Sequence, residues 1–237
     1  MKPEIFYKDE TGLRALTSDA SLDFTPLDFD SPLTDCQQRY LRQYAGVDIP
    51  EVFWRKQVHG DEVLVLSHGS QDRAIYRACQ GADAFITKSL NLPLAIRTAD
   101  CVPVFIFDPI HKAIGLAHAG WKGTYQQIGV KTIEKMRQAY GSAPAQLKVV
   151  LGPAIRSCCY QVGEEFEGYF PQHVKLRDGK RYVDIISVNC EQLLQGGVKT
   201  ENIVDSGICT CCDKNYFSFR RQGAQAGRMI SLMMLLS

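Results

Sequence analysis

The sequence predicts an α+β fold, in which mixed β-sheet structure has helices packed on its outside. Its 237 residues are 45% hydrophobic and 22% charged, the balance of a globular protein that can bury a substantial core. Apolar segments rich in β-branched residues occur in hairpins as well as next to helices, which does not match a regular doubly wound fold. No Pro/Gly/Ser-rich linker or block of charge divides the chain, so we expect residues 1–237 to form a single domain.

Local patterns place the elements along the chain. Runs of β-branched and aromatic residues predict strands, and apolar residues at helical spacing predict helices. Thr34 or Asp35 can cap a helix that ends at Gly46, and Gly141 is a stop signal for a second one. The expected strands are 4–8, 13–16, 52–58, 63–66, 94–98, 102–107, 113–117, 147–151, 182–185, one near 203, and 228–235. The expected helices are 35–45, 125–140, 164–170 and 188–194, and 67–82 is expected to be irregular.

Charge and apolar content exclude several classes of partner. The formal net charge is +1 and the basic residues are scattered, so the sequence lacks the basic patch of a nucleic-acid-binding protein. No apolar run reaches signal-peptide length near Met1 or the roughly 20 residues of a membrane span. We therefore expect a cytoplasmic protein with neither nucleic acid nor membrane as a partner. Its nine cysteines are expected to be thiols or metal ligands, because disulfides are rare in the cytosol.

The hairpin around Asp108-Pro109 predicts the geometry of a possible site. If residues 108–111 form its loop, facing positions place Cys101 opposite His118. Cross-strand neighbours have β-carbons about 4.5 to 5.5 Å apart. A thiolate and an imidazole at that separation can bind one ion, at about 2.3 and 2.0 Å. A loop one residue shorter or longer would place the two side chains on opposite faces of the hairpin.

His59 is the third candidate ligand, because it lies at an expected strand end before Gly60. Two imidazoles and one thiolate form the three-ligand set of a catalytic zinc site, which keeps its fourth position open for water or substrate. Asp100, beside Cys101, is a candidate for handling protons. Copper is less compatible, because multicopper chemistry needs many histidines and the chain has five. Taken singly, Cys101 is compatible with a packing role and His118 with that of a hydrogen-bonded strand-end residue.

Other cysteines form a rival metal site. Cys209-Thr210-Cys211-Cys212 could bind a structural zinc ion, together with Cys158-Cys159. Zinc ribbons use two Cys-x-x-Cys knuckles, and the sequence contains no such pair of knuckles. The site with one cysteine and two histidines is therefore preferred.

Cationic side chains near the expected site could hold a phosphate or a carboxylate. Lys122 and Arg220 are the first candidates for a phosphate dianion, and Arg97 and Arg221 are further ones. Each of these residues singly is equally compatible with a solvated surface charge.

Several short blocks carry a resemblance to a known family. They are Gln57-Val58-His59-Gly60, Gly81-Ala82-Asp83-Ala84, Thr98-Ala99-Asp100-Cys101-Val102-Pro103-Val104, His118-Ala119-Gly120-Trp121-Lys122-Gly123, Leu151-Gly152-Pro153-Ala154-Ile155, Cys209-Thr210 and Phe217-Ser218-Phe219-Arg220-Arg221. In their order, from about residue 52 to the C-terminus, they resemble the laccase-domain proteins. These proteins were first called multicopper polyphenol oxidases, are also known as YfiH-like, and are now described as purine nucleoside phosphorylases.

This resemblance implies a four-layer α/β/β/α sandwich with mixed sheets, related to bacterial toxins that have a cysteine-histidine hydrolase site. It also implies zinc on His59, Cys101 and His118, and it adds Gln57 to the substrate-binding residues. The implied reactions are phosphorolysis of adenosine, inosine, guanosine and 5′-methylthioadenosine to the base and (methylthio)ribose 1-phosphate, and deamination of adenosine. The implied partners are small molecules, a nucleoside and phosphate, for a monomer or homodimer.

The sequence departs from the family near its N-terminus and near its end. Residues 18–32 and 35–39 replace the usual Gly/Ser-rich turn and Asn-containing segments, and Gln225-Ala226-Gly227-Arg228 only partly matches the usual Thr-Gly-Arg. None of these differences involves the expected metal ligands, so we expect them to affect the choice of substrate and to leave the metal site intact.

Three alternatives remain open on the sequence. Cys101 could be a nucleophile and His118 its base in amide hydrolysis, for example of a cell-wall precursor. The chain could also be a copper-dependent polyphenol oxidase, or a zinc-stabilised binding module without catalytic activity.

Overall fold

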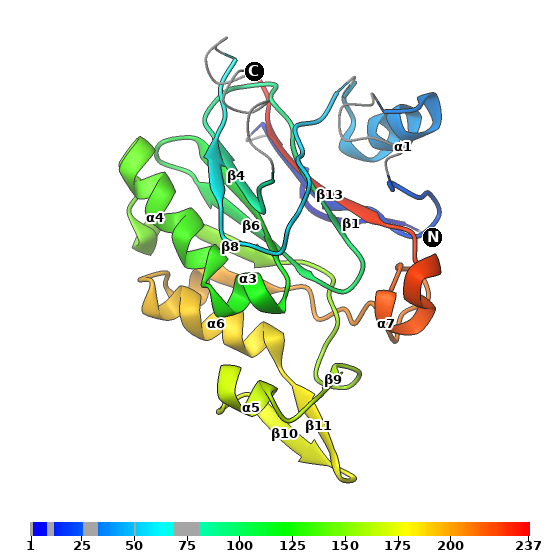
Figure 1. Cartoon of the computed structure of the whole chain (residues 1–237). Coiled ribbons are helices and arrows are strands. Elements are labelled where there is room, and N and C mark those ends of the chain that lie inside the picture. Colours follow the sequence, from blue (N-terminus) through cyan, green and yellow to red (C-terminus); the bar gives the residue numbers. More distant parts are fainter. Residues whose placement is uncertain (1, 9–11, 26–32, 50, 69–80) are drawn as a thin grey trace.

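The computed structural model describes residues 2–8, 12–25, 33–49, 51–68 and 81–237 (Figure 1). The segment expected to be irregular, 67–82, and the atypical segment 18–32 lie partly outside these ranges. The strands are β1 Glu4–Lys8, β2 Leu13–Thr17, β3 Val63–Val65, β4 Ala84–Thr87, β5 Leu94–Thr98, β6 Val102–Asp108, β7 Ala113–Ala119, β8 Lys148–Leu151, β9 Gln161–Val162, β10 Val174–Arg177, β11 Lys180–Val183, β12 Ile203–Asp205 and β13 Met229–Leu235. The helices are α1 Asp35–Ala45, α3 Trp121–Tyr125, α4 Ile128–Tyr140, α5 Phe166–Tyr169, α6 Ile185–Gln195 and α7 Phe219–Gln222.

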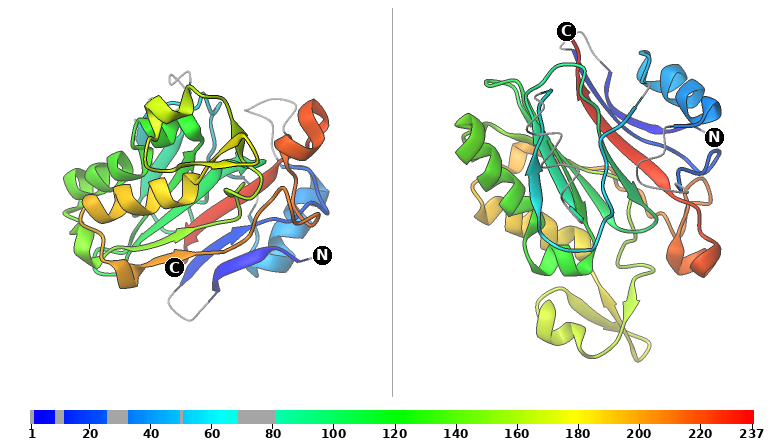
Figure 2. Two further views of the ribbon diagram at one scale, coloured as in Figure 1. Left: turned by 90° about the horizontal axis from the view of Figure 1, so that it is seen from below. Right: turned by 45° about the horizontal axis from the view of Figure 1, so that its top comes forward.

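A six-stranded mixed sheet has the order β12-β8-β6-β7-β4-β3. Its two outer pairs, β12 with β8 and β3 with β4, are parallel, and the pairs between them are antiparallel. One face of this sheet packs against α4 and α6 (Figures 1 and 2), where Val104 and Ile106 of β6 share a buried cluster with Met136 and Leu193. Helix α4 comes so close to β7 that a β-carbon on Gly115 would lie 3.0 Å from the Met136 sulfur.

A four-stranded antiparallel sheet, β1-β2-β13-β5, lies against the other face of the six-stranded sheet. Because side chains alternate along a strand, Phe105 of β6 points away from the helices and joins Leu94 and Met233 in a cluster between the two sheets. On β13, Leu232 faces the opposite way and packs in a further cluster with Leu41 of α1. The alternation of side chains along β6 and β13 therefore divides their apolar residues among three buried clusters.

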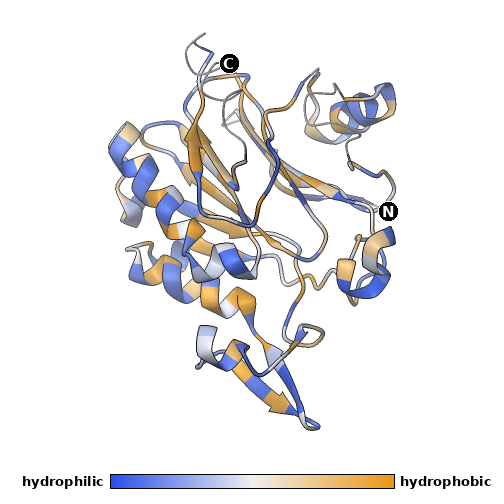
Figure 3. Ribbon diagram, viewed as in Figure 1, coloured by the Kyte–Doolittle hydropathy of each residue, from blue (hydrophilic) through white to orange (hydrophobic). Residues whose placement is uncertain are grey.

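Sequence signals at the ends of α1 work as expected. The Thr34 hydroxyl accepts a hydrogen bond from the Gln37 N–H, and the Gln37 side chain accepts one from the Thr34 N–H, which forms a capping box. Gly46 ends the helix in the left-handed conformation, with φ of 77°. The hydropathy colouring shows α1 and α4 banded along their length, and predominantly hydrophobic residues on the central strands (Figure 3).

A small three-stranded sheet, β10-β11-β9, and α5 form a lobe at one end of the molecule (Figures 1 and 2). The hairpin of β10 and β11 turns at Asp178-Gly179, with both residues at positive φ. The sequence analysis missed β10, although Asp-Gly between two short runs is a strong hairpin signal. No helix among the residues described here is long and apolar enough to cross a membrane.

Two expected elements are wrong in their extent. The expected strand 52–58 is not a strand; Phe53 forms only an isolated bridge with Leu94. Side chains replace the ladder bonds there, because the Gln57 amide binds both the N–H and the carbonyl of Arg97. The expected helix 125–140 is divided into α3 and α4, because Gln127 adopts a left-handed conformation with φ of 62°.

The register of the β6–β7 hairpin also differs from the expectation. Pro103, and not Cys101, lies opposite His118. The loop still has four residues, but they are 109–112, because Asp108 stays in the ladder and its carboxylate accepts the N–H groups of Ile110 and His111. The residue opposite His118 is two positions further along the strand than expected, and side chains two positions apart lie on the same face. Cys101 therefore stays on the same face as His118. The two side chains therefore remain diagonal neighbours.

Replacing Phe105 by Ala tests the core between the sheets. The ring is 1% exposed and lies 4.9 Å from the Phe6 ring, so its loss leaves a cavity that the two sheets cannot close. We expect Phe105→Ala to lower the free energy of unfolding by about 3 to 5 kcal/mol in urea denaturation. Ile110→Ala is the control, because Ile110 is 62% exposed in the hairpin loop. Equal effects of the two substitutions would contradict this packing.

Candidate active site

A cavity of about 590 Å³ opens where β5 and β7 end and β6 begins. Its wall contains the three expected ligands together with residues from segments that are distant in sequence. Asp100 and Gly120 come from the strand ends, Tyr160 from the loop after β8, Arg220 from α7, and Arg228 from the start of β13. The cavity is therefore assembled from both large sheets and from the loops that join them.

His59, Cys101 and His118 meet at one side of this cavity. One potential ligand atom of each lies within 4.8 Å of the other two. The Cys101 sulfur is 3.9 Å from His59 Nε2, and the two imidazole rings are 4.9 Å apart, edge to face. His118 is buried, Cys101 half-buried and His59 exposed. The expected convergence of a sulfur and two imidazoles is thus present in the structure.

Asp83, which is fully buried, organises two of these ligands. Its carboxylate accepts a hydrogen bond of 2.8 Å from His118 Nδ1, and it accepts the backbone N–H groups of Val58, His59 and Gly60 at 3.1, 3.1 and 2.9 Å. With Nδ1 engaged, His118 presents Nε2 to the site, as a carboxylate-bound metal ligand does. The same carboxylate holds the turn on which His59 has a left-handed backbone, with φ of 58°.

Asp83 belongs to one of the family blocks, and the sequence pattern alone predicts no role for it. The signal that could have found it is a carboxylate directly before a short apolar strand, a position at which it can orient a histidine on the neighbouring strand. Its pKa is lowered: burial alone would raise it, but the hydrogen bond and charge of His118 and the backbone donors outweigh burial. The carboxylate is therefore ionised at neutral pH.

The electrostatics of Cys101 and His118 are coupled. Burial alone would raise the pKa of the Cys101 thiol, but the two imidazoles lower it to about 6. Burial alone would lower the pKa of His118, but the Cys101 thiolate and the Asp83 carboxylate raise it to about 9. Without a metal ion, a thiolate beside an imidazolium is therefore the stable state between these two values.

Gly120 leaves room for the three side chains. A β-carbon at this position would lie 2.8 Å from His59 Cδ2 and 3.2 Å from the Cys101 sulfur. Its φ of −69° is open to any residue, so the requirement for glycine comes from space alone. The family block that contains Gly120 is thus explained by the close approach of the β7–α3 junction to the site.

Asp100 lies in the cavity wall, but its carboxylate already has partners. One oxygen accepts the Thr210 hydroxyl at 2.7 Å and the other accepts the Arg220 N–H at 2.6 Å. Asp100 itself has a left-handed backbone, with φ of 100°, which turns the chain just before Cys101. In the described structure it ties the 210–220 segment to the chain just before β6.

The candidate substrate-binding residues separate into two groups. Arg97, Arg220 and Gln57 line the cavity, whereas Lys122 is exposed and does not belong to the described lining. Arg221 uses its guanidinium to hold the carbonyls of Thr210, Cys211 and Tyr216.

Arg228 also lines the cavity, and the sequence analysis had noted it only as a partial motif match. Burial, and next the charge of Arg228, lower the pKa of Arg97 to about 10. The two guanidinium groups therefore repel each other, and the charge of the Asp23 carboxylate offsets part of this repulsion.

The three potential ligands fit a metal ion chemically. Two imidazole nitrogens and a thiolate form a donor set that zinc accepts, and no fourth His, Cys, Asp or Glu of the described chain belongs to the group. A metal held there would keep one position directed to the cavity.

Comparison with known proteins agrees with this site. The family model described as "Multi-copper polyphenol oxidoreductase laccase" matches residues 25–236. The chain therefore belongs to this laccase-like, YfiH-like family, whose curated members include purine nucleoside phosphorylases. The resemblance inferred from the short blocks is confirmed.

Individual relatives carry the names of nucleoside enzymes. The chain is 35% identical over 197 residues to a purine nucleoside phosphorylase of Clostridium acetobutylicum, with 78% of each chain covered. It is 31% identical to "Adenosine deaminase RL5" from an unknown prokaryotic organism, with 79% of this chain and 76% of the relative covered. The crystal structure of YlmD from Geobacillus stearothermophilus superposes with a TM-score of 0.82 at 26% identity, covering 95% and 93% of the two chains. The predicted mixed α and β fold is thus confirmed.

Replacing Asp83 by Asn tests its role as the organiser. An amide cannot supply the charge that orients the His118 ring and raises its basicity, so we expect zinc affinity to fall roughly 10- to 100-fold. The measurement is competition with a chromophoric chelator. Asp61→Asn is the matched control, because Asp61 follows the His59-Gly60 turn that Asp83 holds, and its carboxylate pairs with Lys131 on the surface. Unchanged affinity in Asp83→Asn would remove Asp83 from this role.

The pH dependence of Cys101 alkylation tests the ion pair. In metal-free protein the pKa of Cys101 is lowered to about 6. The rate of its reaction with iodoacetamide is therefore expected to rise through pH 6 and to approach its plateau at neutral pH. Mass spectrometry of the Cys101 peptide gives the profile. His118→Gln removes the imidazolium and should move the midpoint upward. A midpoint that stays near 6 in this variant would show that His118 does not stabilise the thiolate.

Proposed function

We propose that the protein is a zinc-dependent purine nucleoside enzyme. The proposed reactions are phosphorolysis of adenosine, inosine, guanosine and 5′-methylthioadenosine, and deamination of adenosine. One observation supports the proposal above all others: the three potential ligands lie in the wall of a cavity of about 590 Å³, which arginine and aromatic side chains also line. The names of the relatives support the same class of substrate.

His59, Cys101 and His118 would hold the zinc ion. A zinc ion bound there would supply Lewis-acid chemistry at its open position. The soft thiolate and the small number of histidines favour zinc over the copper sites of oxidases. Asp83 keeps the His118 proton on Nδ1, so that Nε2 stays a donor to the metal.

Arginine side chains would bind the phosphate. In phosphorolysis a phosphate oxygen forms a bond to C1′ of the ribose while the bond from C1′ to the base nitrogen breaks, and the base takes up a proton. Arg97, Arg220 and Arg228 all line the cavity, so an anion bound there would be close to three positive charges. We assign phosphate to these three guanidinium groups, which suit a dianion through paired hydrogen bonds. Lys122 becomes the weaker candidate.

Aromatic and polar groups remain for the nucleoside. Tyr160, Phe219 and Trp121 all line the cavity, and a purine can stack on such rings. Phe219 is 54% exposed, which leaves its face accessible to a ligand. Gln57 and Asp100 are assigned positioning roles: Gln57 holds the backbone of Arg97, and Asp100 holds the backbone of Arg220. Deamination at C6 adds water and releases ammonia, and we propose that it occurs in this same cavity.

The order of the buried clusters supports a four-layer α/β/β/α classification. Helices α4 and α6, the six-stranded sheet, the four-stranded sheet and α1 follow one another, with an apolar cluster at each contact. We propose this classification for residues 1–237, in agreement with the implied relation to toxins that have a cysteine-histidine site.

One observation favours a second function, amide hydrolysis. Cys101, His118 and Asp83 could act as nucleophile, base and orienting carboxylate, because Asp83 accepts a hydrogen bond from His118. The pKa of the Cys101 thiol is also lowered to about 6. A metal ion on the same sulfur would prevent this reaction, so metal content separates the two proposals.

Product analysis with purified protein tests the function. With adenosine and phosphate we expect adenine and ribose 1-phosphate; with adenosine alone we expect inosine. Elemental analysis should show one zinc ion fewer in Cys101→Ala than in the wild type. This variant should retain its circular dichroism melting transition and lose turnover, because an open catalytic site contributes less to folding than a closed structural one. Full nucleoside turnover in Cys101→Ala would contradict the proposal, and unfolding of the variant would favour a binding module.

Arginine substitutions test the phosphate assignment in the same assay. Arg220→Ala and Arg228→Ala each remove a charged hydrogen-bond donor, so we expect the KM for phosphate to rise roughly 10- to 100-fold. Lys122→Ala is the control and should leave this KM nearly unchanged. The opposite ranking of Lys122 and the arginines would return phosphate binding to Lys122.

A further inference from the structure

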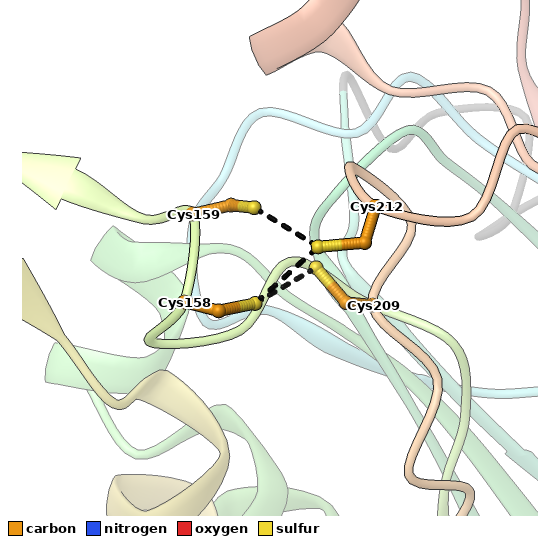
Figure 4. Close-up of side chains that lie close together, drawn as sticks. All are labelled: Cys158, Cys159, Cys209 and Cys212. Carbon is orange, nitrogen blue, oxygen red and sulfur yellow. Dashed lines mark hydrogen bonds between the residues drawn. The ribbon is translucent and has the colours of Figure 1, made fainter.

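Four cysteines on two loops form a second group of potential metal ligands (Figure 4). None of them belongs to the group of His59, Cys101 and His118. Cys158 and Cys159 come from the loop between β8 and β9. Cys209 and Cys212 come from the loop between β12 and α7. The sulfur of Cys158 is 3.5 Å from that of Cys209 and 3.6 Å from that of Cys212, and the sulfurs of Cys159 and Cys212 are 3.2 Å apart. All four sulfurs lie within 4.8 Å of one another.

These separations match the size of a tetrahedral thiolate site. At a zinc–sulfur distance of about 2.3 Å, two sulfurs of a regular tetrahedron lie about 3.8 Å apart. Three of the sulfur–sulfur distances, 3.2 to 3.6 Å, are slightly shorter than this value, and no distance among the four sulfurs exceeds 4.8 Å. Cys158 and Cys212 each lie near two other sulfurs, so the four surround a common centre. Disulfides would instead join them in pairs, at about 2.05 Å.

The local sequence agrees with such a site on one side. Cys209 and Cys212 have the two-residue spacing of a zinc knuckle. The Asp213 N–H closes the turn on the Cys209 carbonyl at 2.9 Å. On the other side two adjacent cysteines take the place of a second knuckle. The sequence analysis had counted this departure against the site, and only the folded arrangement shows that the sulfurs meet.

One cationic group lies beside the cluster and suits its charge. Four thiolates around a divalent ion carry a net charge of −2. The Arg177 guanidinium donates to the Cys158 carbonyl at 2.9 Å. Cys158 and Cys212 are exposed, so an ion can enter from solvent.

We propose that Cys158, Cys159, Cys209 and Cys212 bind a structural zinc ion that joins the two loops. The joined loops carry residues of the cavity wall: Tyr160 directly follows Cys159, and Arg220 follows the 209–212 turn. The Arg220 guanidinium lies 5.5 Å from the centre of the Tyr160 ring. The zinc ion therefore supports the wall on which we placed phosphate and nucleoside contacts, while it takes no part in the chemistry. With four protein ligands the site is closed, as structural zinc sites are.

Metal stoichiometry and spectroscopy of full-length variants test this proposal. We expect two zinc ions per chain in the wild type, one in Cys209→Ser/Cys212→Ser, and one in Cys101→Ala. Cys36→Ser is the matched control and should keep both, because Cys36 is exposed on α1. After replacement of zinc by cobalt, the double variant should lose about four fifths of the thiolate-to-cobalt absorption, because four of the five proposed metal–sulfur bonds belong to this site.

Two results would overturn the proposal. One is an unchanged metal content and cobalt spectrum in Cys209→Ser/Cys212→Ser. The other is a wild-type mass, measured without reductant, that is lower by two hydrogens for each pair of these cysteines, because that would show disulfides.

Alkylation of the wild-type protein gives a test that does not depend on folding of the variant. Iodoacetamide should react with Cys36 at once and with the four cluster cysteines only after treatment with EDTA, as read by peptide mass spectrometry. Equal reaction rates of Cys36 and the cluster cysteines before EDTA treatment would show that no ion protects them. The three catalytic ligands contribute one cysteine, Cys101, whose peptide is measured separately, so failure at the cluster does not bear on the nucleoside reaction.

Discussion

The buried carboxylate of Asp83 is the interaction on which the candidate active site depends. It accepts the Nδ1 hydrogen of His118 and three consecutive backbone N–H groups around His59. Four donors offset the cost of burying the charge, and they give one anion control over two of the three potential metal ligands. Because His59 and His118 belong to segments that are not neighbouring strands, no local contact could replace this carboxylate.

The stacked sheets explain why the site lies at this edge of the molecule. Arg97 lies on β5 and Cys101 directly precedes β6, so the short passage between these two strands leads from one sheet to the other at the site. Asp100 makes that passage possible through its positive φ, and its carboxylate fastens the 210–220 segment above the ligands. The cavity thus lies at the edge of two stacked sheets, while Tyr160 in its wall comes from a loop, as binding residues often do.

A structural ion at the four cysteines would hold together the two loops that lead to Tyr160 and Arg220. Tyr160 lies on one of these loops, and the other leads to Arg220 on α7. Among the described residues, the regular backbone pairing between the two loops is mainly the bridge between Ala154 and Cys209. A cross-link that does not depend on secondary structure can fix such loops at a defined distance. Catalysis and wall stability would then depend on two different kinds of metal site within one chain.

The sequence by itself determined the local elements with clear signals, such as the capped helix that ends at Gly46, and it identified the three potential ligands through short motifs. It did not determine the hairpin register, the left-handed break at Gln127, or the roles of Asp83 and Arg228. The roles of Asp83 and Arg228 depend on partners 24 to 131 residues away, namely Asp83 with His59 and Arg97 with Arg228. Only the tertiary structure decided them, because hydrogen bonds and charges act through distance in space, whereas periodicity and turn signals act along the chain.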